Sequence, residues 1–199
     1  MQTMTDIEAI FKAHGGIMRT KELQNSGIYY KKLQQMIAAG QIEQIRRGYY
    51  QYIDENAFAE APLIAKLFPD GVVCRESALE YYGYTDRTPS AWNVAVRADS
   101  ARMRFKIDYP VVKPHFIEPS RFVIGITHTL MDGTNIKIYD RDRTICDCLL
   151  HRNKMDAEVF NSAVRSYLRD SNRNEAHLAL YAQKLCVEKK VREVLGIWL

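Results

Sequence analysis

No stretch of this 199-residue sequence carries the roughly 18 consecutive apolar residues that a membrane-spanning helix requires. The N-terminal segment carries the acidic residues Asp6 and Glu8 near its start and lacks the small-residue cleavage site of a signal peptide. The four cysteines include no CxxC pair and lack the spacing of a zinc ribbon. We therefore expect a cytoplasmic protein with no membrane association, whose cysteines are reduced and mostly buried.

Sequence motifs of several enzyme classes are also missing. The chain has no Walker loop, no GxGxxG and no HExxH. The five histidines are scattered, and none pairs with Cys or Asp at metal-ligand spacing. A nuclease would need a carboxylate cluster with a lysine on a neighbouring strand, and Asp132, Lys137 and Asp140 are only a fragment of one. We expect no enzymatic activity, no metal and no other cofactor.

The sequence does hold the composition of a folded globular protein, with 47% hydrophobic and 26% charged residues. Its formal net charge of +4 is unevenly distributed. Residues 1–53 carry seven Lys and Arg against four acidic residues, whereas the remainder carries 21 against 20. Most of the excess positive charge therefore lies in the N-terminal quarter, which permits a nucleic-acid partner there.

The first 54 residues have the element order of a winged helix-turn-helix. Asp6 is placed to cap a first helix, and Thr20 to cap a second one after a short extended segment. A third helix spans about residues 29–39 and ends at Gly40. Two β-rich segments around Gly48 then predict a hairpin. We expect a DNA-binding domain over residues 1–54.

The remaining sequence predicts a linker helix within residues 55–70 and a C-terminal domain over residues 71–199. This second domain alternates short strands and turns before it becomes helical, which predicts a small, mainly antiparallel sheet. One of the expected strands covers residues 121–130. Four helices follow a cap at Asp140, the last reaching Trp198. The expected fold class is α+β: a winged helix-turn-helix, then a mixed α/β domain with a helical C-terminal tail.

The third helix is the expected reading element, because a helix-turn-helix inserts that helix into the major groove. At 100° per residue, Tyr29, Leu33, Met36 and Ile37 share its apolar side. The opposite side combines Gln, which can bridge adenine edges, with Lys, which can reach guanine or phosphate, and it carries no acid.

Two further features extend this surface. The arginines at the hairpin tip can contact phosphate or enter the minor groove, and the start of the second helix offers backbone N–H groups to a phosphate. The alternative to DNA binding is that the domain makes only protein contacts and that its basic residues are simply exposed to solvent. The predicted DNA-contacting residues are Thr20, Lys21, Lys31, Lys32, Gln34, Gln35, Arg46 and Arg47.

The helical tail carries a second group of basic side chains. Three arginines are spaced by four residues, although Ser171 and Asn172 favour a helix break before the last of them. This group is either a solvated face or a surface for an acidic partner or DNA. Its members are Arg165, Arg169, Arg173, Lys184, Lys189 and Lys190.

Three segments resemble one known family, the AbiEi-type antitoxins, in the same order along the chain. The first runs from Gly16 to Leu23, continues through Gly27, Leu33 and Gly40, and ends with Ile45 to Tyr50. The second joins Ser77-Ala78-Leu79 to Tyr82-Gly83-Tyr84-Thr85 and Pro89. The third, residues 140–149, is similar to an Arg-Thr-Ile-x-Asp helix start. Within it, Arg143 and Asp147 are four residues apart and predict a structural ion pair rather than a catalytic site.

The resemblance implies an antitoxin of a bacterial type IV toxin–antitoxin, or abortive infection, system, which is a form of phage defence. Such an antitoxin represses its own operon by binding inverted repeats in double-stranded promoter DNA. It counters a nucleotidyltransferase toxin, AbiEii, without a stable complex. Because one winged helix reads only a short half-site, we expect two copies to pair on DNA. In solution we expect a monomer.

Two alternatives remain open at this stage. One is a DNA-targeted nuclease, whose active site would unite Asp132, Lys137 and Asp140. The other is a one-component transcriptional regulator whose second domain binds a small ligand. A deep apolar pocket lined by Tyr81, Tyr82 and Trp92 would favour that regulator.

Overall fold

The computed structural model describes residues 4–53 and 59–196 of the chain. These residues form two compact units: an N-terminal unit of residues up to 69 with 106–110 and 131–134, and a C-terminal unit of the remaining residues from 70 onward. Both units combine helices with a sheet, so the mixed α and β composition is confirmed. In the described part of the chain, no helix has the length and apolar character needed to cross a bilayer.

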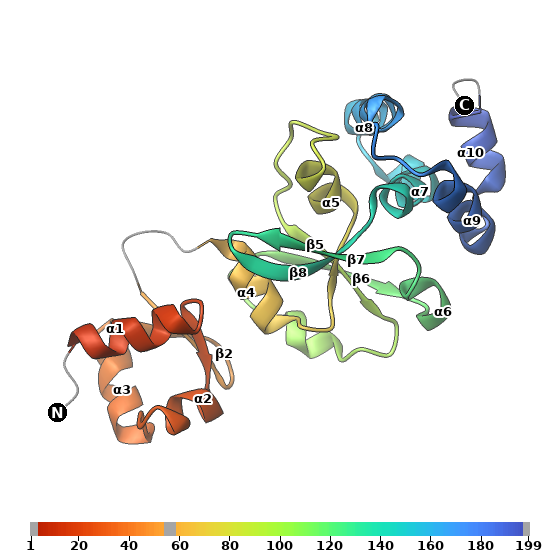
Figure 1. Cartoon of the computed structure of the whole chain (residues 1–199). Coiled ribbons are helices and arrows are strands. Elements are labelled where there is room, and N and C mark those ends of the chain that lie inside the picture. Colours follow the sequence, from red (N-terminus) through yellow and green to blue (C-terminus); the bar gives the residue numbers. More distant parts are fainter. Residues whose placement is uncertain (1–3, 54–58, 197–199) are drawn as a thin grey trace. The chain divides into compact units, whose positions relative to one another are not determined.

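The N-terminal unit contains helices around a three-stranded sheet, coloured red to orange in Figure 1. Strand β3 lies in the centre of this sheet and pairs antiparallel with both neighbours. The apolar sides of the first three helices share one core with the sheet, built around fully buried side chains such as Phe11, Met18 and Leu23. Its elements are α1 (Met4–Ala13), β1 (Ile17–Arg19), α2 (Thr20–Asn25), α3 (Tyr30–Ala38), β2 (Ile42–Arg46), β3 (Tyr49–Tyr52) and α4 (Glu60–Leu67).

Helix ends in this unit differ in detail from the predicted ones. Asp6 lies inside α1, which begins two residues earlier at Met4, so the predicted cap is wrong. Thr20 is the first residue of α2, and Arg19 occupies the cap position before it. The Glu22 carboxylate satisfies this helix start instead, because it accepts a hydrogen bond from the Arg19 amide at 2.7 Å. Within the predicted linker segment the structure has α4, which belongs to the N-terminal unit, and the part of the prediction that falls on residues 55–58 lies outside the described residues.

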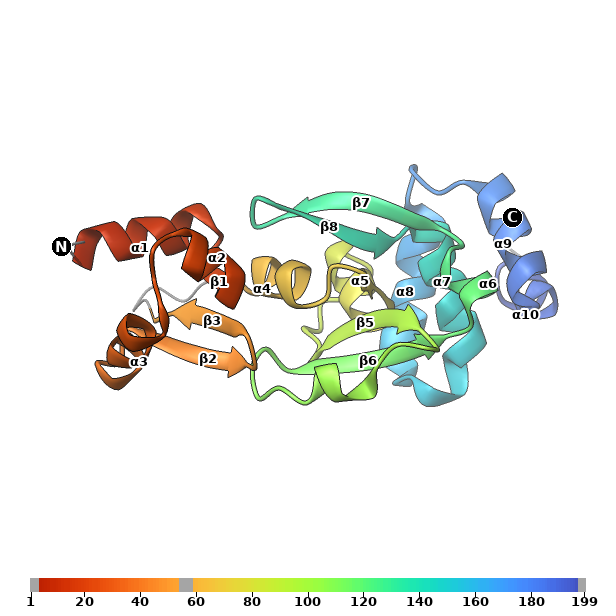
Figure 2. The same cartoon turned by 90° about the horizontal axis from the view of Figure 1, so that it is seen from below.

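The C-terminal unit has a five-stranded sheet with the order β6-β5-β4-β8-β7. Helices α7 to α10 gather at one end of this sheet (Figures 1 and 2). Helix α7 packs against α5, α8, α9 and α10, and so forms the centre of the helical layer. The elements are β4 (Val72–Val73), α5 (Arg75–Tyr81), β5 (Trp92–Arg97), the 3₁₀ helix η1 (Arg102–Phe105), β6 (Val112–Ile117), α6 (Pro119–Phe122), β7 (Ile126–Met131), β8 (Thr134–Tyr139), α7 (Arg141–His151), η2 (Arg152–Lys154), α8 (Ala157–Arg169), α9 (Glu175–Leu185) and α10 (Glu188–Val194).

The prediction of a mainly antiparallel sheet is wrong for this unit. Strand β4 pairs antiparallel with β5 but parallel with β8, and β5 pairs parallel with β6 along its whole length. The adjacent course of β5 and β6 is visible in Figure 2. Parallel neighbours require a connection that crosses over, and these connections were not readable from short strand patterns.

Residues 121–130 do not form the single strand that their composition predicts. Glu118 caps a one-turn helix, α6, by accepting a hydrogen bond from the Ser120 amide at 3.1 Å, and Pro119 starts it. Gly125 then takes a φ of +74° before β7 begins. The first two residues of the expected strand, Arg121 and Phe122, thus belong to this helical turn instead. Helix α10 ends at Val194, and the expected extension to Trp198 falls on residues outside the described part.

Candidate nucleic-acid interface

Helix α3 is held between two well-defined ends. Tyr29 precedes it in an extended conformation, and Gly40 follows it with a φ of +67°. The Gly40 amide donates to the Ile37 carbonyl and the Gln41 amide to the Met36 carbonyl, both at 3.0 Å. These two bonds are the pair expected where a left-handed glycine ends a helix. The helix is therefore short and fixed, and its buried side is anchored in the core.

The outer side of α3 is exposed and free of acidic residues. Lys31, Gln34 and Gln35 are exposed, and Lys32 is half-buried. The apolar side holds Leu33 and Met36, each only 3% exposed. The structure thus brings the predicted α3 residues together on one solvent-facing surface.

Two tyrosines join this surface that the sequence interpretation placed elsewhere. Tyr29 was expected on the apolar side, but it is 65% exposed because it precedes the helix rather than lying in it. Tyr30 is 76% exposed in the first turn of α3. Large aromatic side chains with this exposure beside lysines are unusual on a purely solvated helix and are available for base or sugar contacts.

The two arginines at the tip of the β2–β3 hairpin point in different directions. Arg47 is exposed, next to Gly48 at a φ of +82°. Arg46 points back onto its own unit: its guanidinium donates to the Leu67 carbonyl at 2.8 Å and lies 4.1 Å from the Tyr49 ring centre. Only Arg47 therefore presents its charge at the tip, whereas Arg46 contacts the C-terminal end of α4.

The start of α2 lies against the same hairpin. The Thr20 amide donates to the Gly48 carbonyl at 3.0 Å, so the first residue of α2 is tied to the hairpin turn. Lys21 is exposed beside it. Arg19, which the sequence interpretation did not single out, is also exposed and lies 5.2 Å from the Tyr49 ring centre. Its pairing with Tyr49 across β1 and β3 depends on strand register, and register was not predicted from the sequence.

Glu22 places a negative charge at this helix start. Its carboxylate also receives a hydrogen bond from Lys66 of α4 at 2.6 Å. Burial raises the pKa of Glu22, but the bonds from the Arg19 amide and Lys66 outweigh it and lower that pKa overall. An ionised side chain thus already interacts with the α2 start, where the sequence interpretation placed a phosphate.

The basic residues of the helical tail do not line up as one stripe. Arg165 and Arg169 are exposed on α8, which ends at Arg169. Arg173 lies beyond that end, and its guanidinium donates to the Leu168 carbonyl at 2.5 Å. Lys184 is exposed on α9 and Lys189 and Lys190 on α10, where Lys190 donates to the Leu150 carbonyl at 3.1 Å.

Arg143 and Asp147 form an ion pair inside the C-terminal unit. The Arg143 Nε lies 3.1 Å from Asp147 Oδ1, and both side chains are at most 5% exposed. Arg143 Nη1 also donates to the carbonyls of Arg121 and Ile124, at 2.7 and 2.8 Å. Arg143 therefore connects α7 to α6 and to the segment that follows α6, so the ion pair stabilises the packing of these elements.

Asp140, Asp142 and His177 come together in the C-terminal unit, which sequence spacing did not indicate. Their possible ligand atoms lie within 4.8 Å of one another. Sequence spacing did not place a histidine beside these aspartates, and the structure does so because α9 brings His177 to the start of α7. Asp142 already accepts from Tyr167 at 2.9 Å and Asp140 from Tyr181 at 2.9 Å. The cluster is explained as a capping network, and Asp140, which a nuclease would need, is part of it.

Comparison with known proteins bears on both units. Residues 6–53 match the family described as transcriptional regulator, AbiEi antitoxin. The crystal structure of the RV2827C protein from Mycobacterium tuberculosis is similar in fold, with a TM-score of 0.68 and 12% identity, over 96% of this chain and 75% of that chain. No curated protein matches the chain in sequence. Residues 6–53 are thus similar to the family that the resemblance predicted, and the solved structure shows a similar fold for the whole chain.

Proposed function

We propose that this protein is an antitoxin that represses its own operon, with the N-terminal unit as a winged helix-turn-helix. The observation that carries the proposal is the exposed, acid-free outer side of α3 on a segment that matches a family of antitoxin regulators. In this arrangement α3 is the reading helix and the β2–β3 hairpin is the wing.

The reading surface divides into two kinds of contact. Gln34 and Gln35 are suited to base edges, since an amide can bond both N6 and N7 of adenine. Lys31, Lys21 and Arg47 are suited to phosphates, which supply affinity without sequence preference. One domain reads a short half-site, so two copies on an inverted repeat, about 34–36 Å apart, account for an operator. We propose a monomer in solution that pairs on DNA in the cytoplasm.

The C-terminal unit is proposed to carry the antitoxin activity against a nucleotidyltransferase toxin. The exposed Arg165, Arg169 and Lys184 are the side chains available for an acidic partner on its helical layer. No stable complex is required, because the antitoxin counteracts the effect of the toxin.

The DNA-binding part is tested by fluorescence anisotropy on the DNA directly upstream of the protein's own gene. Gln34→Ala with Gln35→Ala is expected to cost about 1–3 kcal/mol on the operator and little on unrelated DNA. Lys31→Ala with Arg47→Ala is expected to weaken both kinds of DNA alike. Lys12→Ala is the matched control, because Lys12 is an exposed lysine of the same unit that pairs with Glu8 on α1. Undiminished operator binding by both double variants would refute this reading surface.

The antitoxin part is tested separately by co-expression with a nucleotidyltransferase encoded beside the gene. The full-length wild-type protein is expected to restore growth. The variants with weakened DNA binding are expected to restore it equally well if the two activities belong to different units. Failure of the wild-type chain to restore growth would refute the antitoxin role while leaving the DNA-binding role untouched.

A further inference from the structure

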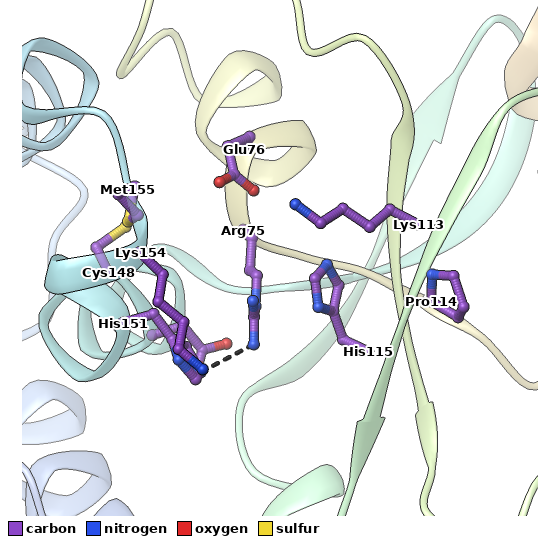
Figure 3. Close-up of a pocket in the computed structure, with 10 residues that line it drawn as sticks. Arg75, Glu76, Lys113, Pro114, His115, Cys148, His151, Lys154 and Met155 are labelled. Carbon is purple, nitrogen blue, oxygen red and sulfur yellow. Dashed lines mark hydrogen bonds between the residues drawn. The ribbon is translucent and has the colours of Figure 1, made fainter.

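The C-terminal unit contains a cavity of about 200 Å³ between α5, β6 and the end of α7, and most of the residues that line it carry charged or polar side chains. Figure 3 shows Arg75 reaching from α5 between His151 and His115, with Lys113 extending from β6 toward α5. This lining differs from the apolar pocket that a ligand-responsive regulator was expected to have. The side chains on which the argument rests are Arg75, Glu76, Lys113, His115, His151 and Lys154.

Arg75 is held in position by a neutral histidine. Its Nη2 lies 2.9 Å from His151 Nε2. Burial, followed by the charges of Arg75 and Lys154, lowers the pKa of His151 to about 4. The imidazole is therefore neutral at physiological pH, so its Nε2 accepts the bond from Arg75. Arg75 also has a φ of +49°, a conformation that non-glycine residues rarely adopt and that is often found where function requires it.

His115 adds a hydrogen-bonding group without adding charge. Its Nε2 lies 2.8 Å from Asn93 Oδ1, and the Asn93 amide nitrogen donates to the Ala91 carbonyl at 3.2 Å. Because that second bond assigns Oδ1 as the acceptor, His115 Nε2 is the donor and its Nδ1 is left as an acceptor. Burial, with the positive charges of Arg75 and Lys113, lowers the pKa of His115 to about 3.

The charges of the cavity do not cancel. Arg75, Lys113 and Lys154 contribute three positive charges, and Glu76 and Asp147 contribute two negative ones. Asp147 is neutralised by Arg143 at 3.1 Å. Within the residues that the structure describes, neither lysine has an acidic partner within 4 Å. The cavity therefore has an excess of two positive charges, the complement of a phosphate monoester dianion.

Glu76 adds a hydrogen-bond acceptor to this positively charged cavity. Its Oε2 is buried and has no hydrogen-bond partner among the described residues. A buried acceptor without a donor costs about 1–3 kcal/mol. A ligand that brings a hydroxyl or amine donor to Glu76, as well as an anion to the cations, complements both features of the cavity.

We propose that this cavity binds a small phosphate monoester that carries hydroxyl groups, such as a sugar phosphate. The phosphate contacts Arg75, Lys113 and Lys154, and a hydroxyl donates to Glu76. Pockets that bind drug-sized ligands have volumes of about 300–1,000 Å³, so a cavity of about 200 Å³ suits a compact ligand rather than a nucleoside triphosphate. The proposal is independent of DNA binding and of the antitoxin role.

The test is isothermal titration calorimetry of the full-length protein with ribose 5-phosphate, inorganic phosphate and ribose as probes. Ribose 5-phosphate is expected to bind at least about tenfold more tightly than inorganic phosphate, and ribose is expected not to bind. Absence of binding by both phosphate probes at about 10 mM, well above the 1 mM of a weak site, would overturn the proposal. Equal affinity for the two phosphate probes would overturn the role of Glu76.

Three variants localise the site. Lys113→Ala removes an exposed side chain and is expected to weaken both phosphate probes by about tenfold, equivalent to about 1.4 kcal/mol. Glu76→Met is expected to abolish the preference for ribose 5-phosphate over inorganic phosphate. Lys184→Ala, an exposed lysine on α9 that does not line the cavity, is the matched control. Binding that is unchanged by Lys113→Ala, or weakened equally by Lys184→Ala, would contradict this assignment.

Discussion

Gly125 is the residue whose replacement the fold should tolerate least well. Its φ is +74°, and a Cβ added there would lie 2.5 Å from the Arg143 Cβ. Gly125→Ala is expected to destabilise the C-terminal unit by more than the 1 kcal/mol or so that a left-handed alanine costs. Urea unfolding followed by circular dichroism measures the change.

Gly83→Ala is the matched control, because Gly83 has a φ of +68° in the same unit and its Cβ would meet no atom within 4 Å. The difference between the two variants isolates the close approach to Arg143. Equal destabilisation by both substitutions would show that the ion-paired arginine can move aside.

Asp170 makes the stability of the C-terminal unit depend on acidity. Burial raises its pKa, but hydrogen bonds from Tyr84, the Asn172 amide and Arg141 outweigh burial and lower it to about 2. A carboxyl with a lowered folded-state pKa stabilises the protein above its ordinary value of 3.8, and this contribution is lost as the pH falls toward 2.

The measurement compares urea unfolding of wild type and Asp170→Asn between pH 5 and pH 2. The wild type is expected to be the more stable of the two at pH 5. The difference between their free energies of unfolding is expected to become smaller as the pH falls. A difference in the free energy of unfolding that stays constant over this pH range would show that the ionised carboxylate is not the source of the stabilisation.

At the scale of elements, we expect the two adjacent arginines of the β2–β3 hairpin to differ in role, with Arg46 stabilising the N-terminal unit and Arg47 contacting DNA. Arg46→Ala removes a bond to the Leu67 carbonyl and stacking on Tyr49, so it is expected to destabilise the N-terminal unit by about 1–3 kcal/mol. Arg47→Ala is expected to leave the stability unchanged and to lower the slope of log affinity against log salt by about 1.

Thermal unfolding and salt titrations of DNA binding on the two single variants test this division. Each variant serves as the control for the other, because the substitutions remove the same side chain at neighbouring positions. Loss of salt dependence with Arg46→Ala and no loss of stability would reverse the assignment.

The elements that the sequence predicted well are those specified by local chemistry. Asp140 accepts a hydrogen bond from the Arg143 amide at 2.8 Å, as expected of a residue placed to cap α7. Gly40 ends α3 for an equally local reason. The α6 turn was missed because Pro119 and Ser120 fit both a turn and a helix start, and only the cap by Glu118 distinguishes them.

The candidate sites depend on contacts that no local pattern encodes. The parallel pairing of β5 with β6 sets the place of His115 beside Asn93, and α9 brings His177 to Asp142 from 35 positions further along the chain. The outward side of α3 was predictable because helical periodicity alone decides it. The inward turn of Arg46 was not, since it depends on the position of α4.

At the scale of the whole molecule, the proposed phosphate contacts would make the affinity for DNA depend on salt concentration. With about four phosphate contacts per domain, the affinity of one copy is expected to fall about 100-fold between 50 and 200 mM monovalent salt. Fluorescence anisotropy on operator and unrelated DNA checks this slope. A slope of log affinity against log salt concentration near zero would show that base contacts supply the affinity, rather than phosphate contacts by Lys31, Lys21 and Arg47.

The hydrogen bond between the Thr20 amide and the Gly48 carbonyl has a thermodynamic consequence for the proposed association with a DNA duplex. It joins the start of α2 to the hairpin turn, so the two surfaces that flank α3 are already ordered in the free protein. Binding then costs overall translation and rotation but little conformational entropy of a loop. The heat capacity change should therefore match the apolar area buried at the interface, without the additional term that accompanies folding on binding.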